Sequence, residues 1–292
     1  MSDNYQRLFI SQNELAEKIA AQQSGTLNGP KLSIVDGSWY LPAMNRDGKA
    51  EYAQARIPGG VFFDIDDVAS KDQGLPHMLP PTDVFAKAAG NMGISVDDEV
   101  VVYDGPGIFS SARVWWTFWI MGCDNIRVLP GGMDAWKAAG LPIETGPPPA
   151  KQPAHFEIEF DADDVQDFDY MLNNIQKQQT LVLDARPRAR FIGEMPEPRA
   201  GLHSGHIPGS RSLPSSELVR DGALIPVDEL REKFRQVGFQ LGAHTTTTCG
   251  SGVTAAIISL ALEAIGHPDH SLYDGSWAEW GSKPDVPVAR WD

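Results

Sequence analysis

The sequence reads Thr245-Thr-Thr-Thr-Cys-Gly-Ser-Gly-Val-Thr-Ala255 near its C-terminal end. The β-branched threonines favour a strand, and the apolar segment that follows, Ala255 to Ile265, ends at Gly266 as a buried helix does. Cys249 therefore lies on the turn between a strand and a helix. A thiol there faces free backbone N–H groups and the positive end of the helix dipole, and both favour the thiolate.

The turn also contains Gly250 and Gly252, which allow the loop to curl tightly and to aim its amides inward. This pattern predicts a nucleophile on an anion-binding loop. The alternative is that Cys249 is a small buried hydrophobic residue at the end of a strand. The Gly-Ser-Gly context and the helix behind it favour the nucleophile.

Composition limits the class of protein. The chain has 292 residues, enough for two domains, and its 42% hydrophobic and 22% charged residues are typical of soluble globular proteins. A net charge of −15 argues against binding to nucleic acid or to an anionic membrane surface. The two cysteines, Cys123 and Cys249, imply no disulfide framework, and we interpret Cys123 as structural. With no secretory signal pattern and no apolar run of ~20 residues, we expect a cytoplasmic protein.

The chain is an internal repeat, because four segments recur in the same order in its two halves. Leu32–Asp36 corresponds to Leu181–Asp184, Ile57–Val61 to Ile207–Arg211, Val100–Asp104 to the threonine strand with Cys249, and Leu129–Trp136 to Leu272–Trp280. Short apolar runs alternate with longer helical patterns in each half. We therefore expect an α/β fold of two tandem units, each a parallel sheet flanked by helices.

The proline-rich stretch Thr145-Gly-Pro-Pro-Pro-Ala-Lys-Gln-Pro153 separates the halves and reads as a stiff linker. The predicted domains are residues 1–144, without a catalytic cysteine, a linker over 145–154, and a catalytic domain over 155–292. Ser11 and Glu14 predict a capping box, with Ile10 and Leu15 as a hydrophobic staple. Further helices are predicted over residues 83–91, 111–121, 165–176 and 228–237.

Ligands of open parallel sheets bind beyond the carboxyl ends of the strands, where Cys249 is predicted to lie. Its counterpart in the first half is the segment Asp104-Gly-Pro-Gly-Ile108, which has no thiol. We therefore expect the second half to react and the first half to shape the cleft.

Together these segments resemble the rhodanese superfamily, and most closely the 3-mercaptopyruvate sulfurtransferases. The resemblance runs from about Ser33 to Trp280. It is carried by the two tandem units and by Cys249–Ala255, Tyr273–Trp280, Arg190-Phe-Ile-Gly-Glu-Met-Pro-Glu-Pro-Arg199, Phe62–Asp66 and His77–Pro80. It implies two tandem rhodanese-like domains.

The resemblance implies a reaction in which Cys249 attacks the sulfur of 3-mercaptopyruvate. Pyruvate leaves, and the persulfide on Cys249 passes its outer sulfur to cyanide, a small thiol or a thioredoxin-like protein. The amides of Gly250, Gly252, Val253 and Thr254 would hold the sulfur anion without a metal or a basic side chain nearby. No cofactor and no metal ion is implied.

Loop chemistry bears on the sulfur donor. Relatives that prefer thiosulfate carry basic residues after the cysteine, whereas this chain has Gly250 and Ser251. A neutral loop favours a monoanionic keto acid as the sulfur donor. Thiosulfate is the alternative donor. An alternative role for the whole protein is a sulfur-relay or binding module. Phosphatases on the related fold need an arginine six residues after the cysteine, where this chain has Ala255.

The family motif assigns Arg190 and Arg199 to the substrate carboxylate and keto group, because a guanidinium offers a permanently charged, bidentate fork. The alternative is that they form surface ion pairs with Glu194 and Glu197. We interpret Arg186 as structural and leave open whether Arg188 takes part.

Ser251, His77 and Asp66 match a proposed hydroxyl–imidazole–carboxylate relay, in which Asp66 orients His77. The alternatives are that His77 only caps a turn and that Asp64 supplies the carboxylate. We interpret His206 as part of a structural turn.

Two features depart from the family pattern. Arg56 stands where a histidine is usual before Ile57. The strand before Cys249 consists of threonines instead of aliphatic residues, and buried threonine hydroxyls need hydrogen-bond partners.

Overall fold

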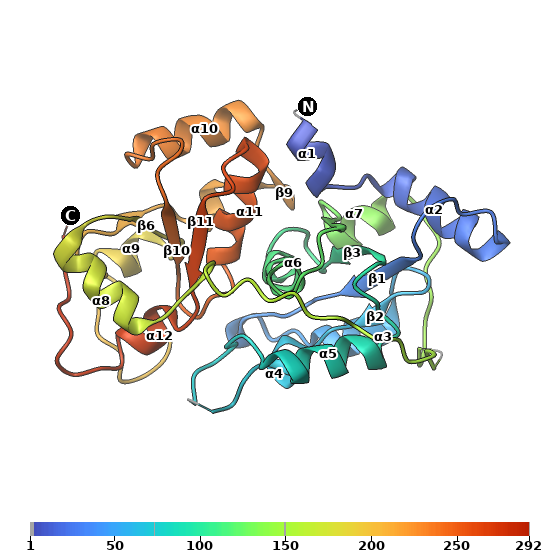
Figure 1. The fold of residues 1–292 in the computed structure, drawn as a ribbon, viewed down its shortest axis with the longest axis horizontal. Coiled ribbons are helices and arrows are strands. Elements are labelled where there is room, and N and C mark those ends of the chain that lie inside the picture. Colours follow the sequence, from blue (N-terminus) through green and yellow to red (C-terminus); the bar gives the residue numbers. More distant parts are fainter. Residues whose placement is uncertain (1–2, 73, 149, 292) are drawn as a thin grey trace.

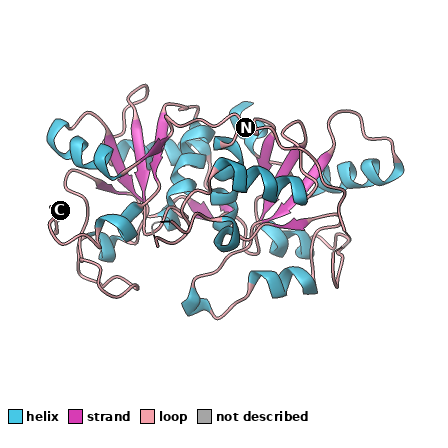
Figure 2. Cartoon of the chain, turned by 60° about the horizontal axis from the view of Figure 1, so that its bottom comes forward, coloured by secondary structure: helices cyan, strands magenta, loops and turns pink. Residues whose placement is uncertain are grey.

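A computed structural model describes residues 3–72, 74–148 and 150–291 and shows two α/β units side by side (Figure 1). Each unit is built on a parallel sheet with helices on both of its faces (Figure 2). We call the part around the N-terminal sheet the first unit and the part around the C-terminal sheet the second unit. The predicted α/β architecture is confirmed.

The first unit has a four-stranded sheet in the order β2-β1-β3-β4, with all neighbours parallel. Every residue of the central strands is buried, which explains the apolar runs Ile34–Val35 and Val100–Tyr103 within them. The strands are β1 (Leu32–Asp36), β2 (Val61–Phe62), β3 (Glu99–Tyr103) and β4 (Ile126–Val128). The helices are α2 (Gln12–Ser24), the 3-10 turn η1 (Pro42–Met44), α3 (Gly48–Gln54), α4 (Ile65–Val68), α5 (Thr82–Asn91), α6 (Ser110–Ile120) and α7 (Gly132–Ala138).

The second unit has a five-stranded parallel sheet in the order β5-β11-β10-β6-β7, with a separate antiparallel pair. Its strands are β5 (Val165–Gln166), β6 (Leu181–Asp184), β7 (Arg211–Ser212), β10 (Thr245–Thr248) and β11 (His270–Tyr273), and the pair is β8 (Val219–Arg220) with β9 (Ala223–Leu224). The helices are α8 (Phe168–Lys177), α9 (Arg188–Phe191), the 3-10 turn η2 (Ser215–Glu217), α10 (Val227–Gln236), α11 (Ala255–Ile265) and α12 (Ser276–Trp280).

The four threonines of β10 are all buried, and each hydroxyl finds a partner. This satisfies the requirement that buried hydroxyls impose on the strand before Cys249. The partners are the Ala243 carbonyl for Thr245 (3.2 Å), Ser271 for Thr246 (3.0 Å), Ser259 for Thr247 (3.1 Å) and Ser276 for Thr248 (3.4 Å).

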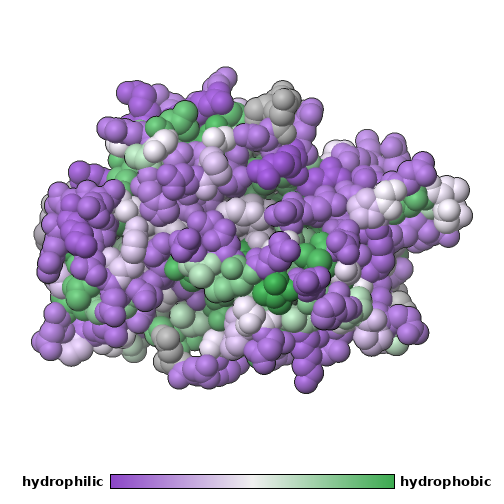
Figure 3. All heavy atoms as spheres, in the orientation of Figure 1, coloured by the Kyte–Doolittle hydropathy of each residue, from purple (hydrophilic) through white to green (hydrophobic). Residues whose placement is uncertain are grey.

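The two units share one hydrophobic core, because α6 and α11 pack against each other at the centre of the molecule (Figure 1). All residues of α11 are buried, as its apolar sequence predicted. Helix α1 (Asp3–Leu8), at the start of the described chain, also contacts α11 and so belongs to this junction. The face shown in Figure 3 is mainly hydrophilic, with a hydrophobic area near its middle.

The predicted helices are found with small shifts, and one needs correction. The segment 165–176 is helical only from Phe168, because Val165 and Gln166 form β5 and pair with β11. The capping box is half formed. Ser11 Oγ accepts the Glu14 amide at 3.2 Å, but the Glu14 carboxylate accepts from Arg127. Ile10 and Leu15 are buried in one cluster, as a staple requires.

The proline-rich segment runs along the first unit. The Gly146 amide donates to the Ala53 carbonyl at 2.8 Å, and the Ala154 amide donates to the Gly90 carbonyl at 2.9 Å. Arg56 holds the start of this segment through the Gly146 carbonyl at 2.5 Å and Glu144 at 3.3 Å. The domain limits at residues 144 and 154 stay predictions. No helix within the described ranges is long and apolar enough to cross a bilayer.

Candidate active site

A cavity of about 180 Å³ opens at the carboxyl end of β10, and we call it the Cys249 cavity. Side chains of both units form its wall. The first unit supplies Trp39, Leu41 and Phe109, and the second supplies Ala185, Arg186, Pro187, Arg190, Pro198, Arg199, Ser215, Cys249, Gly250, Ser251, Val253 and Thr254. Seven of the ten predicted site residues, with the nucleophile Cys249 among them, thus line one cavity.

Ser276 holds the Cys249 loop in place through hydrogen bonds to its backbone amides. The Ser276 hydroxyl accepts the Cys249 amide at 3.3 Å and the Gly252 amide at 3.1 Å, and it donates to the Tyr273 carbonyl at 2.9 Å. Ser276 has a φ of 49° and Gly252 a φ of 77°, so both stand in the left-handed region. Gly252 does not line the cavity and acts through the shape of the loop.

Other amides of the loop have no protein partner. Within the described ranges, the N–H groups of Gly250, Ser251, Val253 and Thr254 donate no hydrogen bond. Cys249 itself is only 2% exposed. Unpaired buried amides are costly unless a ligand or water accepts from them, so the loop is suited to an anion.

The first unit contains the same loop with an acid in the place of the thiol. Asp36 is level with Tyr103 in the first sheet, as Asp184 is level with Thr248 in the second, so Asp104 corresponds to Cys249. The Asp104 carbonyl accepts from Met133 just as the Cys249 carbonyl accepts from Trp277, both at 2.9 Å. Both loops reach their helix after six residues.

The Asp104 carboxylate fills its own loop. It accepts the amides of Gly107 at 2.7 Å, Phe109 at 2.9 Å and Ser111 at 2.8 Å. Burial raises the Asp104 pKa to about 6, against these hydrogen bonds. The corresponding position of the second unit, where Cys249 replaces the acid, is therefore surrounded by the donor groups that an anion needs.

Arg199 supplies a positive charge to the cavity. Within the described ranges it makes no hydrogen bond and no ion pair. Burial lowers its pKa, while Cys249 and the Asp66 carboxylate act in the opposite direction. The expectation that amides alone stand near the sulfur is therefore wrong, because a guanidinium also acts on Cys249.

Arg190 has a different status, because Glu197 engages it. Arg190 Nε donates to Glu197 Oε1 at 3.1 Å, and its Nη2 donates to Oε2. The same carboxylate accepts from Arg186 at 2.8 Å. The alternative of an ion pair with Glu197 thus holds for Arg190 and not for Arg199. Arg186 is 1% exposed and also pairs with Asp184 at 2.6 Å, as a structural residue does.

His77 and Asp66 lie together although neither lines the cavity. His77 Nδ1 is 2.8 Å from Asp66 Oδ1, but the ring is not aligned for a hydrogen bond. The imidazole holds the pKa of Asp66 below its usual value of 3.8. Trp39, which lines the cavity, donates to Asp66 at 2.9 Å and packs edge-on against His77.

The third member of the predicted relay stands apart. Ser251 lines the cavity and is 7% exposed, but no hydrogen bond joins it to His77 within the described residues. The roles of Ser251, His77 and Asp66 stay predictions. Asp64 has another task, because its carboxylate caps α4 by accepting the amides of Asp66 and Asp67.

The remaining candidates are placed away from the thiol. Arg188 begins α9 and is not part of the cavity wall. His206 stacks on Phe191, with ring centroids 3.8 Å apart, and its Nδ1 is 2.9 Å from the Phe191 carbonyl. His206 is therefore structural, as predicted.

Sequence reasoning missed a buried pair that joins the two loops. Arg113, on α6, donates to Asp274 at 2.6 Å, to the His77 carbonyl at 2.7 Å and to the Gly252 carbonyl at 3.5 Å. Asp274 belongs to the quoted Tyr273–Trp280 motif, which gave the only signal for it. Arg113 lies in an apolar helical segment, and nothing in its sequence context indicated this contact.

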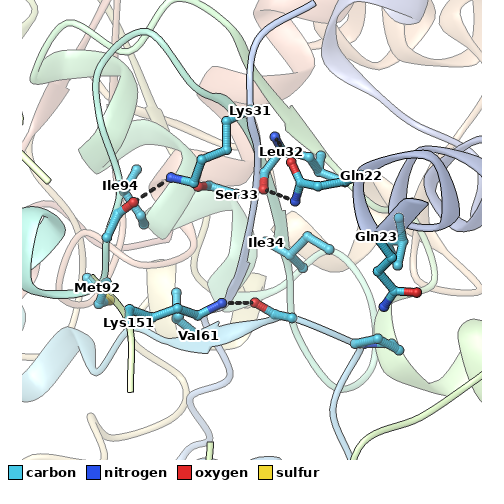
Figure 4. Close-up of a pocket in the computed structure, with 14 residues that line it drawn as sticks. Gln22, Gln23, Lys31, Leu32, Ser33, Ile34, Val61, Met92, Ile94 and Lys151 are labelled. Atoms are coloured by element: carbon cyan, nitrogen blue, oxygen red, sulfur yellow. Dashed lines mark hydrogen bonds between the residues drawn. The ribbon is translucent and has the colours of Figure 1, made fainter. Parts of the chain in front are cut away.

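Four further hollows of the described chain have no cysteine in their walls. Two reach about 580 and 560 Å³ and lie mainly on the first unit. Figure 4 shows a smaller one, of about 110 Å³, beside the start of β1. Its lysines are engaged, since Lys31 donates to the Gly93 carbonyl and Lys151 to the Gly59 carbonyl. No three His, Cys, Asp or Glu side chains in the described ranges are grouped as a metal site needs.

Comparison with known protein families shows to which family the chain belongs. The family described as Rhodanese-like domain is matched twice, over residues 20–139 and 167–283. The chain belongs to the rhodanese-like family. The two matches contain the two sheets, apart from the two-residue β5, so each unit is one rhodanese-like domain.

Curated relatives narrow this membership to the tandem-domain 3-mercaptopyruvate sulfurtransferases. The protein of that name from Escherichia coli K12 is 37% identical, over 96% of this chain and 97% of its own length. The human protein of the same name is 36% identical, over 94% and 92%. Thiosulfate/3-mercaptopyruvate sulfurtransferase 1, mitochondrial, from Arabidopsis thaliana is 39% identical, over 90% of this chain and 75% of its own length.

Solved structures agree with this rhodanese-like assignment. SseA from Escherichia coli superimposes with a TM-score of 0.82 at 35% identity, covering 92% of this chain and 98% of its own. Tum1 from Saccharomyces cerevisiae gives a TM-score of 0.85 at 31% identity, covering 98% and 99%.

Proposed function

We propose that this rhodanese-like protein is a sulfurtransferase that takes sulfur from 3-mercaptopyruvate and carries it on Cys249. The observation that carries the proposal is the Cys249 loop, whose unpaired amides lie beside the guanidinium of Arg199 in a cavity walled by both units. The relatives named 3-mercaptopyruvate sulfurtransferase, at 36–39% identity, support the choice of donor.

In the first step, the Cys249 thiolate attacks the thiol sulfur of the donor. A sulfur–sulfur bond forms and the carbon–sulfur bond breaks, so the electron pair of that bond leaves with the carbon as the enolate of pyruvate. Protonation of the enolate gives pyruvate, and Cys249 keeps the transferred sulfur as a persulfide. The loop amides stabilise the negative charge before and after the transfer, without reorganisation.

Binding of the donor rests on the arginines in this proposal. The Arg199 guanidinium, which has no protein partner in the described chain, binds the carboxylate. Arg190 lies beside it, with Nη2 against Gly250, and contributes through the remaining face of its guanidinium. Trp39 and Phe109 cover the cavity from the first unit and limit the access of water.

The proton for the enolate comes, in this proposal, from the side of Ser251 and His77. The Asp66 carboxylate stays ionised because its pKa is lowered, and it keeps the imidazole in place. His77 is held in a left-handed conformation, with a φ of 60°, and is 6% exposed. Such strain is maintained only where the surrounding contacts fix the residue.

In the second step, an acceptor thiolate attacks the outer sulfur of the persulfide. The sulfur–sulfur bond to Cys249 breaks, the acceptor leaves with the extra sulfur, and the Cys249 thiolate is restored. Cyanide would leave as thiocyanate by the same displacement. A small thiol or a thioredoxin-like protein is the proposed acceptor class in a reducing, cytoplasmic setting.

A second candidate keeps the same residues and takes thiosulfate as the donor, with sulfite leaving. Two relatives from Arabidopsis thaliana, 39% and 37% identical, are named for both donors, which favours testing it. The neutral residues Gly250 and Ser251 favour the keto acid.

The test is intact-protein mass spectrometry after exposure to each donor, with pyruvate and sulfite measured in parallel. We expect an increase of one sulfur atom with 3-mercaptopyruvate, and multiple turnovers when a small thiol is added. Loading without turnover would identify a sulfur-relay module, and no loading from either donor would overturn the proposal.

A further inference from the structure

The charges around the Cys249 cavity form a connected set. Asp184 pairs with Arg186, Arg186 and Arg190 both pair with Glu197, and Arg199 stands without an ion pair in the described chain. Three guanidinium groups and two carboxylates leave one net positive charge. Apart from the Cys249 thiolate and the Asp66 carboxylate, this set of paired side chains therefore leaves the single charge of Arg199 for one carboxylate.

Glu197 decides this balance. Its side chain is 2% exposed, and both of its oxygens accept hydrogen bonds, Oε1 from Arg186 at 2.8 Å and from Arg190 at 3.1 Å, and Oε2 from Arg190. Because Arg190 offers Nε and Nη2 to Glu197, it cannot offer this same pair of donors to a substrate. The negative charge of Glu197 also largely compensates the positive charge of Arg190.

Arg190 nevertheless lies at the reacting loop. Its Nη2 is 3.3 Å from the point where a side chain at Gly250 would begin, next to Cys249. Glu197 also acts electrostatically on Arg199, so its negative charge is felt by both arginines of the cavity. A charge in this position influences a dianion more strongly than a monoanion, since the interaction scales with the charge of the ligand.

We propose that Glu197 is a specificity-determining positioning residue, which compensates Arg190 and thereby makes the cavity select a monoanionic sulfur donor over a dianionic one. The inference rests on the proposed sulfur transfer. It adds a second determinant of donor choice to the neutral loop residues Gly250 and Ser251.

The experiment compares kcat/KM for thiosulfate, a dianion, with kcat/KM for 3-mercaptopyruvate, a monoanion, on the same preparation. Glu197→Gln keeps the shape and removes the charge, so we expect the thiosulfate-to-mercaptopyruvate ratio to rise about tenfold. Arg190→Gln changes the charge in the other direction and should lower the ratio. The double variant Arg190→Gln/Glu197→Gln restores one net positive charge and should return the ratio toward that of the unchanged protein.

Glu194→Gln is the matched control, because Glu194 is exposed in the same segment and lies outside the charge set. Its ratio should not change. The inference is overturned if the ratio of Glu197→Gln stays within about twofold of that of the unchanged protein. If Glu197→Gln does not fold, the same criterion applies to Arg190→Gln. The ratio cancels any inactive fraction, and the thiosulfate rate of Glu197→Gln should also fall more steeply with added salt.

The two proposals fail in different ways. If the unchanged protein is loaded with sulfur but the ratio ignores Glu197, only the role of Glu197 is lost. If the unchanged protein takes sulfur from neither donor, the proposed function is lost with it.

Discussion

Arg113 of the first unit and Asp274 of the second form a salt bridge of 2.6 Å that is buried on both sides. Each partner also binds the opposite loop. Arg113 donates to the His77 and Gly252 carbonyls, and the second oxygen of Asp274 accepts the Leu79 amide at 2.6 Å. One ion pair therefore sets the position of the His77 segment against the Cys249 loop.

Replacing Arg113 by methionine leaves the Asp274 carboxylate buried without its charge partner. We expect a loss of about 3–5 kcal/mol in unfolding free energy, because an uncompensated buried charge is costly. Urea unfolding followed by tryptophan fluorescence measures it. Arg235→Met, which removes an exposed pair with Glu232, should cost much less unfolding free energy. Equal losses in the two variants would contradict the importance of the buried bridge.

Replacing Cys249 by alanine should abolish pyruvate release and the one-sulfur mass increase, since no other thiol lines the cavity. Cys123→Ala is the matched control. Cys123 is fully buried in the first unit, and burial raises its pKa to about 12, so it is not a nucleophile at neutral pH. A one-sulfur adduct that persists on Cys249→Ala would move the reaction to another residue.

Arg199→Gln should raise KM for 3-mercaptopyruvate by about 10- to 100-fold, the loss expected for a hydrogen bond to a charged group. Folding should change little, because no protein partner of Arg199 is removed in the described structure. Steady-state kinetics measure the effect. Arg220→Gln, at an exposed pair with Glu229, serves as control. An unchanged KM would remove Arg199 from the binding site.

The Asp66 carboxylate predicts a pH dependence. Its folded pKa lies below the ordinary 3.8, so its stabilising contact is complete above pH 3.8 and is lost as the pH falls through the lower folded pKa. Asp66→Asn should therefore be less stable than the unchanged protein at neutral pH, and the difference should vanish in strong acid. Melting temperatures from about pH 2 to 8 test this. A difference that grows toward acid would contradict the assigned sign.

Much of the fold could be predicted from local patterns. Helix α11 has the predicted bounds, because an apolar run between a glycine-containing turn and Gly266 leaves little choice. The predicted helix over residues 165–176 was wrong at its start. A two-residue strand gives no periodic signal, and β5 forms by pairing with β11. Tertiary contacts decide such short elements.

The site was predictable where a motif was continuous in sequence. The Cys249 loop is one such motif, and it is found at the end of its strand. The Arg113–Asp274 bridge joins residues 161 positions apart, and neither local periodicity nor composition indicates such a contact. The sequence allows Glu197 to pair with Arg190 or with Arg199, and the structure shows the pair with Arg190, a distinction that depends on side-chain reach.

The carboxylate of Asp104 limits how many sulfur atoms the duplicated chain can carry. An internal acid already takes up the donor groups of the first loop, so this loop has no capacity for a transferred atom. A polypeptide with two copies of the same architecture should therefore become saturated at a single equivalent of bound sulfur.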